Sequence, residues 1–151
     1  MRRFLHARAL LVAVLLLTAE TAALAAGRLE VSGGWIRAAP PNAMMLAAYG
    51  TLRNAGDGPL IFSGAASADF NDVSLHETVE QNGIERMRAL GRVVLAAGET
   101  MTLTPGGRHL MLMQPKRPLH VGDVVEIRLI TETSGSVTAK FVVREEAPPP
   151  G

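Results

Sequence analysis

The stretch at residues 106–113 gathers side chains whose chemistry suits a soft metal ion. It runs Gly-Gly-Arg-His-Leu-Met-Leu-Met, and its apolar part is typical of a short strand that follows a glycine turn. Successive side chains of a strand face opposite sides, so His109, Met111 and Met113 share one face while the two leucines share the other. Imidazole nitrogen and thioether sulfur suit copper(I) above other metals. The alternative interpretation is that these methionines fill a core.

The dipeptide Asn82-Gly83 predicts a hairpin that brings two more such side chains together. A type I′ turn needs positive φ at both central positions, which asparagine and glycine tolerate. Counting outward from this turn places His76 opposite Ala89. His76 and Met87 then become diagonal neighbours on one face of the hairpin, roughly 7–8 Å apart at the backbone. Long side chains bridge that separation.

Short strands would have to hold these residues in place. Apolar runs separated by Gly, Pro and Asn turns recur along the chain, with no long helical pattern. The glycine pair at 33–34 predicts a bulge inside the first strand. We therefore expect one all-β domain, an antiparallel β-sandwich or barrel. Besides the hairpin, the expected strands cover residues 29–37, 44–53, 60–65, 73–79, 91–96, 100–103, 106–113, 125–129 and 137–143.

The two ends of the chain differ in composition from this domain. Basic residues, an apolar run at 9–17 and the small residues at 22–26 are typical of a secretory signal peptide that is cleaved. We therefore expect a cleaved signal peptide at 1–25, export of the mature protein, and a β-sandwich domain at 26–144 that carries the candidate copper ligands. Residues 145–151 show no apolar periodicity and predict a disordered tail.

Charge and cysteine content exclude several classes of function. Without residues 1–25, Lys plus Arg falls from 15 to 12 and Asp plus Glu from 14 to 13, so the formal net charge becomes −1. No basic patch with interleaved aromatics remains, so we expect no nucleic-acid partner. The chain has no cysteine. It therefore has no disulfide, no cysteine nucleophile and no thiolate ligand for a blue-copper centre.

The candidate ligands and their sequence context resemble a known family. His76 is followed by ten residues and Met87, then by 21 residues and His109, then by one residue and Met111. This spacing is similar to that of the periplasmic copper(I) chaperones known as PCuAC. Other segments similar to that family cover residues 42–54, 97–99, 103–112, 116–119 and 121–125.

This resemblance implies a fold, a metal and a role. It implies a cupredoxin-like antiparallel Greek-key β-sandwich or barrel that binds one Cu(I). It also implies delivery of this ion to a copper acceptor, either the binuclear copper centre of cytochrome c oxidase subunit II or another copper chaperone. Such a carrier is not an enzyme, and we expect a monomer that meets a membrane only through its partner. The implied ligands are His76, Met87, His109 and Met111.

Structural interpretations stand beside the functional ones. The alternative for the whole chain is an exported β-sandwich module that binds a protein or ligand, with its His and Met residues serving only in packing. We expect His120 at the surface, Glu77 solvated or behind a ligand, and Trp35 in the core. We interpret Met113 as packing beneath the metal or shielding it. The methionines assigned to packing alone are Met44, Met45 and Met101.

Overall fold

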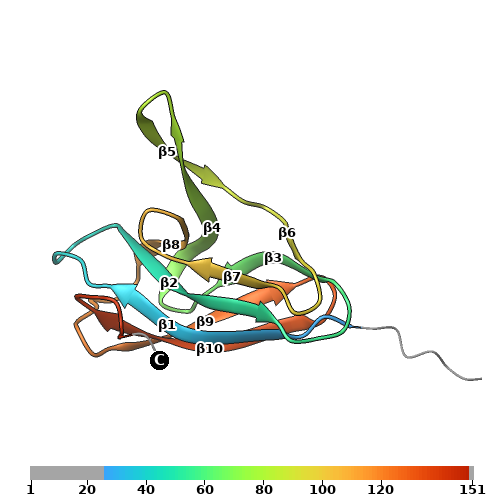
Figure 1. The fold of residues 1–151 in the computed structure, drawn as a ribbon. Helices are drawn as coiled ribbons and strands as arrows, with labels where there is room; N and C mark the ends of the chain where they lie inside the picture. The colour runs from blue at the N-terminus through green and yellow to red at the C-terminus, as the bar shows by residue number, and fades with distance from the viewer. Residues whose placement is uncertain (1–25, 150–151) are drawn as a thin grey trace, which may run out of the picture.

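The computed structural model describes residues 26–149, which fold into strands and turns (Figure 1). In this range no helix is long and apolar enough to cross a membrane. The predicted signal peptide at 1–25 and the last two residues of the predicted tail lie outside the described residues. The strands are β1 (Leu29–Arg37), β2 (Met45–Asn54), β3 (Leu60–Ala66), β4 (Phe70–Gln81), β5 (Ile84–Ala89), β6 (Val93–Leu95), β7 (Thr100–Leu103), β8 (Arg108–Pro115), β9 (Val124–Thr131) and β10 (Gly135–Arg144).

Seven of these strands form a closed barrel in the order β4-β8-β2-β1-β10-β9-β3. The barrel closes where β3 pairs with β4 through Ala65 and Val73. The outer strands β5, β6 and β7 pair with β4, β3 and β2 respectively. Pairing is antiparallel throughout the described residues except between β1 and β10, which run parallel. The all-β architecture that the sequence predicts is confirmed.

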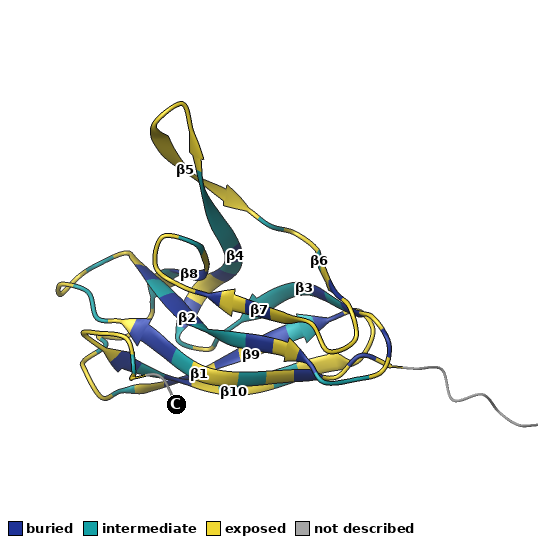
Figure 2. Cartoon of the chain, viewed as in Figure 1, coloured by how far each residue is buried: buried dark blue, intermediate teal, exposed yellow. Residues whose placement is uncertain are grey.

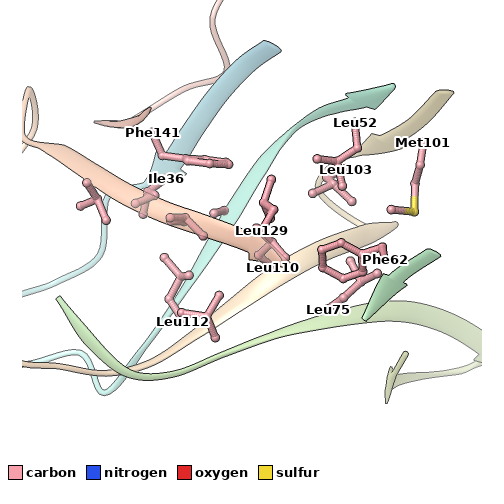
Figure 3. Close-up of a cluster of buried hydrophobic side chains, with 14 of the residues drawn as sticks. Ile36, Leu52, Phe62, Leu75, Met101, Leu103, Leu110, Leu112, Leu129 and Phe141 are labelled. Carbon is pink, nitrogen blue, oxygen red and sulfur yellow. The ribbon is translucent and has the colours of Figure 1, made fainter. Parts of the chain in front are cut away.

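The core fills the barrel with side chains that alternate along each strand. On β9, Val125, Ile127 and Leu129 are fully buried, while the residues between them face solvent. On β8, Leu110 and Leu112 are also fully buried, and Figure 3 shows them among the core side chains. Burying each of these leucines stabilises the fold by about 1.5–3 kcal/mol, which is lost if the strand slips by one residue. The core therefore fixes which face His109 and Met111 occupy.

Two local predictions along the early strands have clear outcomes. The β1–β2 register shifts between Ser32 and Trp35, and Gly33 there has a φ of 60°, so the predicted bulge is confirmed. The prediction of a strand at 73–79 was too short, because β4 begins at Phe70 and continues to Gln81. Polar residues at both ends of β4 are weak strand formers, but pairing with β8 and β5 overrides their local preference.

The β4–β5 hairpin projects from the barrel (Figure 1). Its turn residues Asn82 and Gly83 have φ values of 56° and 75°, as a type I′ turn requires. All residues of β5 are exposed, which Figure 2 shows as one continuous exposed strand. Strand β4 is therefore part of the barrel wall at one end and part of a solvent-exposed arm at the other.

Candidate metal centre

The two candidate histidines lie directly opposite each other on neighbouring barrel strands. The β4–β8 register pairs His76 with His109 and Ser74 with Met111. Residues paired across an antiparallel ladder point to the same face of the sheet. His76, His109 and Met111 therefore share the outer face, on the opposite side of β8 from its buried leucines.

The hairpin adds the fourth candidate ligand to this face. The β4–β5 register pairs His76 with Ala89 and Thr78 with Met87, as counted from the Asn82-Gly83 turn. Thr78 follows His76 by two residues on β4, so Met87 and His76 lie on the same side of the hairpin. The structure thus brings the predicted residues to one surface, which we call the His/Met face: His76, Met87, His109 and Met111.

The hydrogen bonds of His109 determine which of its ring nitrogens is free. This side chain is only 5% exposed, and its Nδ1 lies 3.1 Å from the carbonyl oxygen of Gly107. A carbonyl oxygen only accepts hydrogen bonds, so Nδ1 carries the proton and donates it. The Nε2 lone pair of His109 is then available to bind a metal.

The hydrogen bonds of His76 assign its proton to the other ring nitrogen, Nε2. Its Nε2 lies 3.1 Å from the hydroxyl oxygen of Ser74, which itself donates to Asp72 Oδ2 at 3.3 Å. Because the serine proton goes to the carboxylate, Nε2 of His76 must donate to the serine oxygen. Nδ1 of His76 is then unprotonated, and it is buried with no hydrogen-bond partner among the described residues. An unpaired buried nitrogen is costly, and a bound metal would satisfy it.

The two imidazole rings are close and nearly parallel. The ring centroids of His76 and His109 are 6.0 Å apart, and the ring planes differ by 26°. Burial lowers the pKa of His76, and the neighbouring His109 lowers it further, while Asp72 acts in the opposite direction. His76 is therefore neutral at neutral pH, which is the form that binds metals.

The two thioethers differ in exposure. Met111 is half-buried on the barrel wall, whereas Met87 is 61% exposed on the hairpin. Among residues 26–149, no three His, Cys, Asp or Glu side chains are grouped closely enough to hold a metal ion. A metal on the His/Met face would therefore need methionine sulfur as well as imidazole, which favours a soft ion.

Glu77 braces the opposite side of the hairpin. Its carboxylate accepts a hydrogen bond from Arg88 Nε on β5 at 3.1 Å and pairs with Arg108 on β8 at 3.6 Å. The side chain is 15% exposed, so the expectation of a solvated glutamate was wrong. Hydrogen bonding to Arg88 holds the pKa of Glu77 below its usual value. This carboxylate connects the strands that carry all four candidate ligands.

The sequence did not identify Ser74, Asp72 or the two arginines. The spacing of Ser74 and Asp72, two and four residues before His76, places all three on one face of a strand. That spacing is the available signal, but the strand expected at 73–79 begins after Asp72 and has Ser74 only as its second residue. Arg88 lies opposite Glu77 across the β4–β5 hairpin, so counting from the Asn82-Gly83 turn could have identified it. Arg108 depends on the β4–β8 pairing, which no local pattern predicts.

Other assignments have mixed outcomes. Met101 is buried in the core as expected, and His120 lies at the surface with a 78% exposed side chain. Trp35 is buried as expected, and it packs against Tyr49 with ring centroids 4.8 Å apart. Met44 and Met45 are exposed, so their assignment to packing was wrong.

A groove of about 630 Å³ lies elsewhere, and its lining comes from residues 38–44, 46, 115–121 and 145. Its lining includes several prolines and contains none of the four candidate ligands. The candidate metal chemistry is therefore a feature of the His/Met face on the outside of the barrel rather than of this groove.

Comparison with known proteins shows the family. The family model described as "Putative lipoprotein LpqE-like" matches residues 29–143. The protein named "Putative lipoprotein Lxx21020" from Leifsonia xyli is 40% identical over 113 residues, which cover 74% of this chain and 67% of that protein. The uncharacterized protein RP573 from Rickettsia prowazekii is 25% identical over 103 residues, covering 68% of this chain and 57% of its own length.

Solved structures with the same fold are PCuAC domains and a related protein. The copper-bound PCuAC domain from PmoF2 is 28% identical with a TM-score of 0.65, covering 82% of this chain and 96% of that domain. CuI-DR1885 from Deinococcus radiodurans is 31% identical with a TM-score of 0.62, covering 83% of this chain and 84% of that one. These matches confirm the expected cupredoxin-like fold and the resemblance to PCuAC proteins. The chain belongs to the LpqE-like family and has the fold of a PCuAC domain.

Proposed function

We propose that this protein is a copper(I) metallochaperone that binds one ion through His76, Met87, His109 and Met111. The observation that carries the proposal is the pairing of His76 with His109, in which each ring keeps one unprotonated nitrogen. The similar copper-bound PCuAC domain from PmoF2 and the similar CuI-DR1885 both carry copper, which supports the same metal here.

The donor set is suited to carrying copper rather than to storing it permanently. Copper(I) accepts nitrogen and neutral sulfur in a distorted tetrahedron, and thioethers need no deprotonation to bind. Thiolates bind copper(I) more strongly than thioethers do, so a cysteine-containing acceptor would take the ion from this site. The proposed acceptor is the binuclear copper centre of cytochrome c oxidase subunit II, or another copper chaperone, in the periplasm.

The exposure of the ligands suggests the order of ligand exchange. Met87 is the most exposed of the four and lies on the projecting hairpin, whereas His109 is buried in the barrel wall. An approaching thiolate would therefore displace the Met87 thioether first, while the histidines still hold the ion. Copper stays in the +1 state throughout, so the transfer needs no electron donor.

A transfer assay tests this role. We propose that the donor acts as a monomer. The Cu(I)-loaded protein is mixed with a reduced acceptor domain that contains the two-cysteine copper site of an oxidase subunit II. The two proteins are then separated, and the copper content of each is measured. We expect copper to move to the acceptor, and to stay with the donor when the acceptor cysteines are replaced by serine. Retention of copper by the donor in both cases would contradict the chaperone role.

A further inference from the structure

Two more methionines lie on the His/Met face beside the four candidate ligands. The β2–β8 register places Met45 directly opposite Met113. Met113 follows Met111 by two residues on β8, so both side chains point to the same face. On the other side of β8, Asp72 of β4 lies directly opposite Met113. Two thioethers and one carboxylate therefore form a row across β2, β8 and β4.

Packing does not account for this pair. Met45 is 51% exposed and Met113 is half-buried, and neither belongs to the main hydrophobic cluster of the described residues. Met101 provides the contrast, because it is 2% exposed inside that cluster. An exposed thioether gains little from the hydrophobic effect, but it remains accessible as a soft ligand.

The geometry allows both sulfurs to reach one ion. Directly opposed residues of an antiparallel pair have Cβ atoms about 4.5–5.5 Å apart, and the long, flexible methionine side chain spans that gap. The Asp72 carboxylate is exposed on the same face and adds a negative charge that attracts a cation. This set contains no imidazole, so it should bind copper(I) more weakly than the histidine-containing site.

We propose that Met45 and Met113, beside Asp72, form a second and weaker copper(I) site that loads the first. The inference rests on the proposed function, since it describes how the ion arrives. Met113 lies two positions after Met111 on the same strand, which is about 7 Å at the strand rise of 3.3–3.4 Å per residue. A copper ion held by Met113 is thus one short exchange away from Met111.

Methyl NMR during a copper(I) titration tests the second site. The purified protein carries ¹³C-labelled methionine methyl groups and is titrated anaerobically with Cu(I). We expect the first equivalent to shift the methyl signals of Met87 and Met111, and excess copper to shift those of Met45 and Met113. The buried Met101 should not respond.

Variants separate this site from the first one. In Met45→Leu/Met113→Leu, which conserves side-chain volume, we expect the second phase to disappear while the affinity for the first equivalent stays within about twofold. Loading from a competing chelator should slow several-fold. Met44→Leu is the matched control, because Met44 is exposed but lines the groove with Leu46. It should leave both phases unchanged.

The possible failures are distinguishable. A second phase that persists in the double variant, or that leaves the Met45 and Met113 signals unshifted, would overturn the second site. In the parent protein, copper(I) could shift the Met45 and Met113 signals without shifting those of Met87 and Met111. That result would contradict the proposed function while supporting copper binding by Met45 and Met113. Equal slowing of loading by Met44→Leu would overturn the loading role.

Discussion

His76 and His109 face each other across the β4–β8 pairing, and each ring uses one nitrogen to donate a hydrogen bond to a neighbouring oxygen. The remaining nitrogen of His76 is buried without a partner among the described residues. The rings are thus fixed in orientation before any metal arrives. A donor set that is fixed in advance loses less conformational entropy on binding than one that must be ordered.

The first prediction concerns pH. The pKa of His76 lies below its ordinary value, so the unfolded chain takes up a proton that folded His76 resists. The free energy of unfolding should be fully retained above about pH 6.5 and should fall as the pH drops below it. Copper(I) affinity should fall over the same acidic range, because protons compete for the histidines.

Urea unfolding of the apoprotein between pH 7.5 and pH 5.5 checks this dependence. The variant His76→Gln should show a smaller change over that interval, whereas His120→Gln, which alters an exposed histidine, should behave like the parent. An equal pH dependence in all three proteins would contradict the role of His76 burial.

The second prediction concerns Ser74, which holds His76 in position. Replacing Ser74 by alanine removes the acceptor for the Nε2 proton and frees the ring to rotate. Changes of this kind behind a ligand cost about 10–100-fold in metal affinity. A chromophoric competition assay should therefore show copper(I) affinity reduced by about that factor.

The matched control for Ser74→Ala is Ser63→Ala. Ser63 is a half-buried strand serine whose hydroxyl donates to the carbonyl of Ile130, away from the His/Met face. This variant should keep the parent affinity. If the two variants weakened copper binding equally, the effect would reflect a general loss of stability.

The third prediction concerns the brace formed by Glu77. In Glu77→Gln the ion pairs with Arg88 and Arg108 are lost, so β5 is held less firmly against β4, and β4 is held less firmly against β8. We expect faster amide hydrogen exchange in β5 and copper(I) affinity lowered several-fold, because Met87 samples more positions. Glu80→Gln alters an exposed glutamate of the same strand and should change neither quantity. If amide exchange in β5 of Glu77→Gln were unchanged, this would contradict the claim that Glu77 holds β5 in place.

The fourth prediction concerns Asn54, a fully buried polar residue at the end of β2. Its amide nitrogen donates to the carbonyls of Gly58 and Leu95, and its side-chain oxygen accepts from the amides of Arg28 and Gly56. Asn54→Ala leaves several buried groups unpaired, so the free energy of unfolding should fall by about 2–4 kcal/mol. Chemical denaturation measures this change.

The exposed Asn71 supplies the control for Asn54. Its amide donates to Gln114 at the surface, and Asn71→Ala should alter stability by less than about 0.5 kcal/mol. Copper(I) binding should survive both substitutions at temperatures where the proteins stay folded. A loss of copper from folded Asn54→Ala would contradict the separation of the core from the metal site.

Local patterns predicted the parts of the site that depend on local geometry. The Asn82-Gly83 turn sets the register of its own hairpin, so the placement of Met87 near His76 followed by counting. Alternation along β8 likewise set His109 and Met111 on one face, because burial of Leu110 and Leu112 fixes that strand.

The contacts between distant strands could not be predicted in this way. The pairing of His76 with His109 joins segments far apart in the sequence, and only the closed barrel determines their register. The link from Asp72 through Ser74 to His76 was missed because polar residues weaken the local strand pattern. Met45 was assigned to packing from residue type alone, whereas the fold leaves its side chain 51% exposed.

The most direct test of the four-ligand site is the copper(I) stoichiometry measured against a chromophoric competitor strong enough to report only tight binding. The parent protein is compared with Met87→Ala/Met111→Ala, and Met44→Ala serves as the control for loss of an exposed methionine. We predict one tightly bound copper ion in the parent and in the control, and none in the double variant, with an unchanged β-sheet circular dichroism spectrum in all three. Equal retention of copper by the folded double variant, or no tight copper in the parent, would contradict the site.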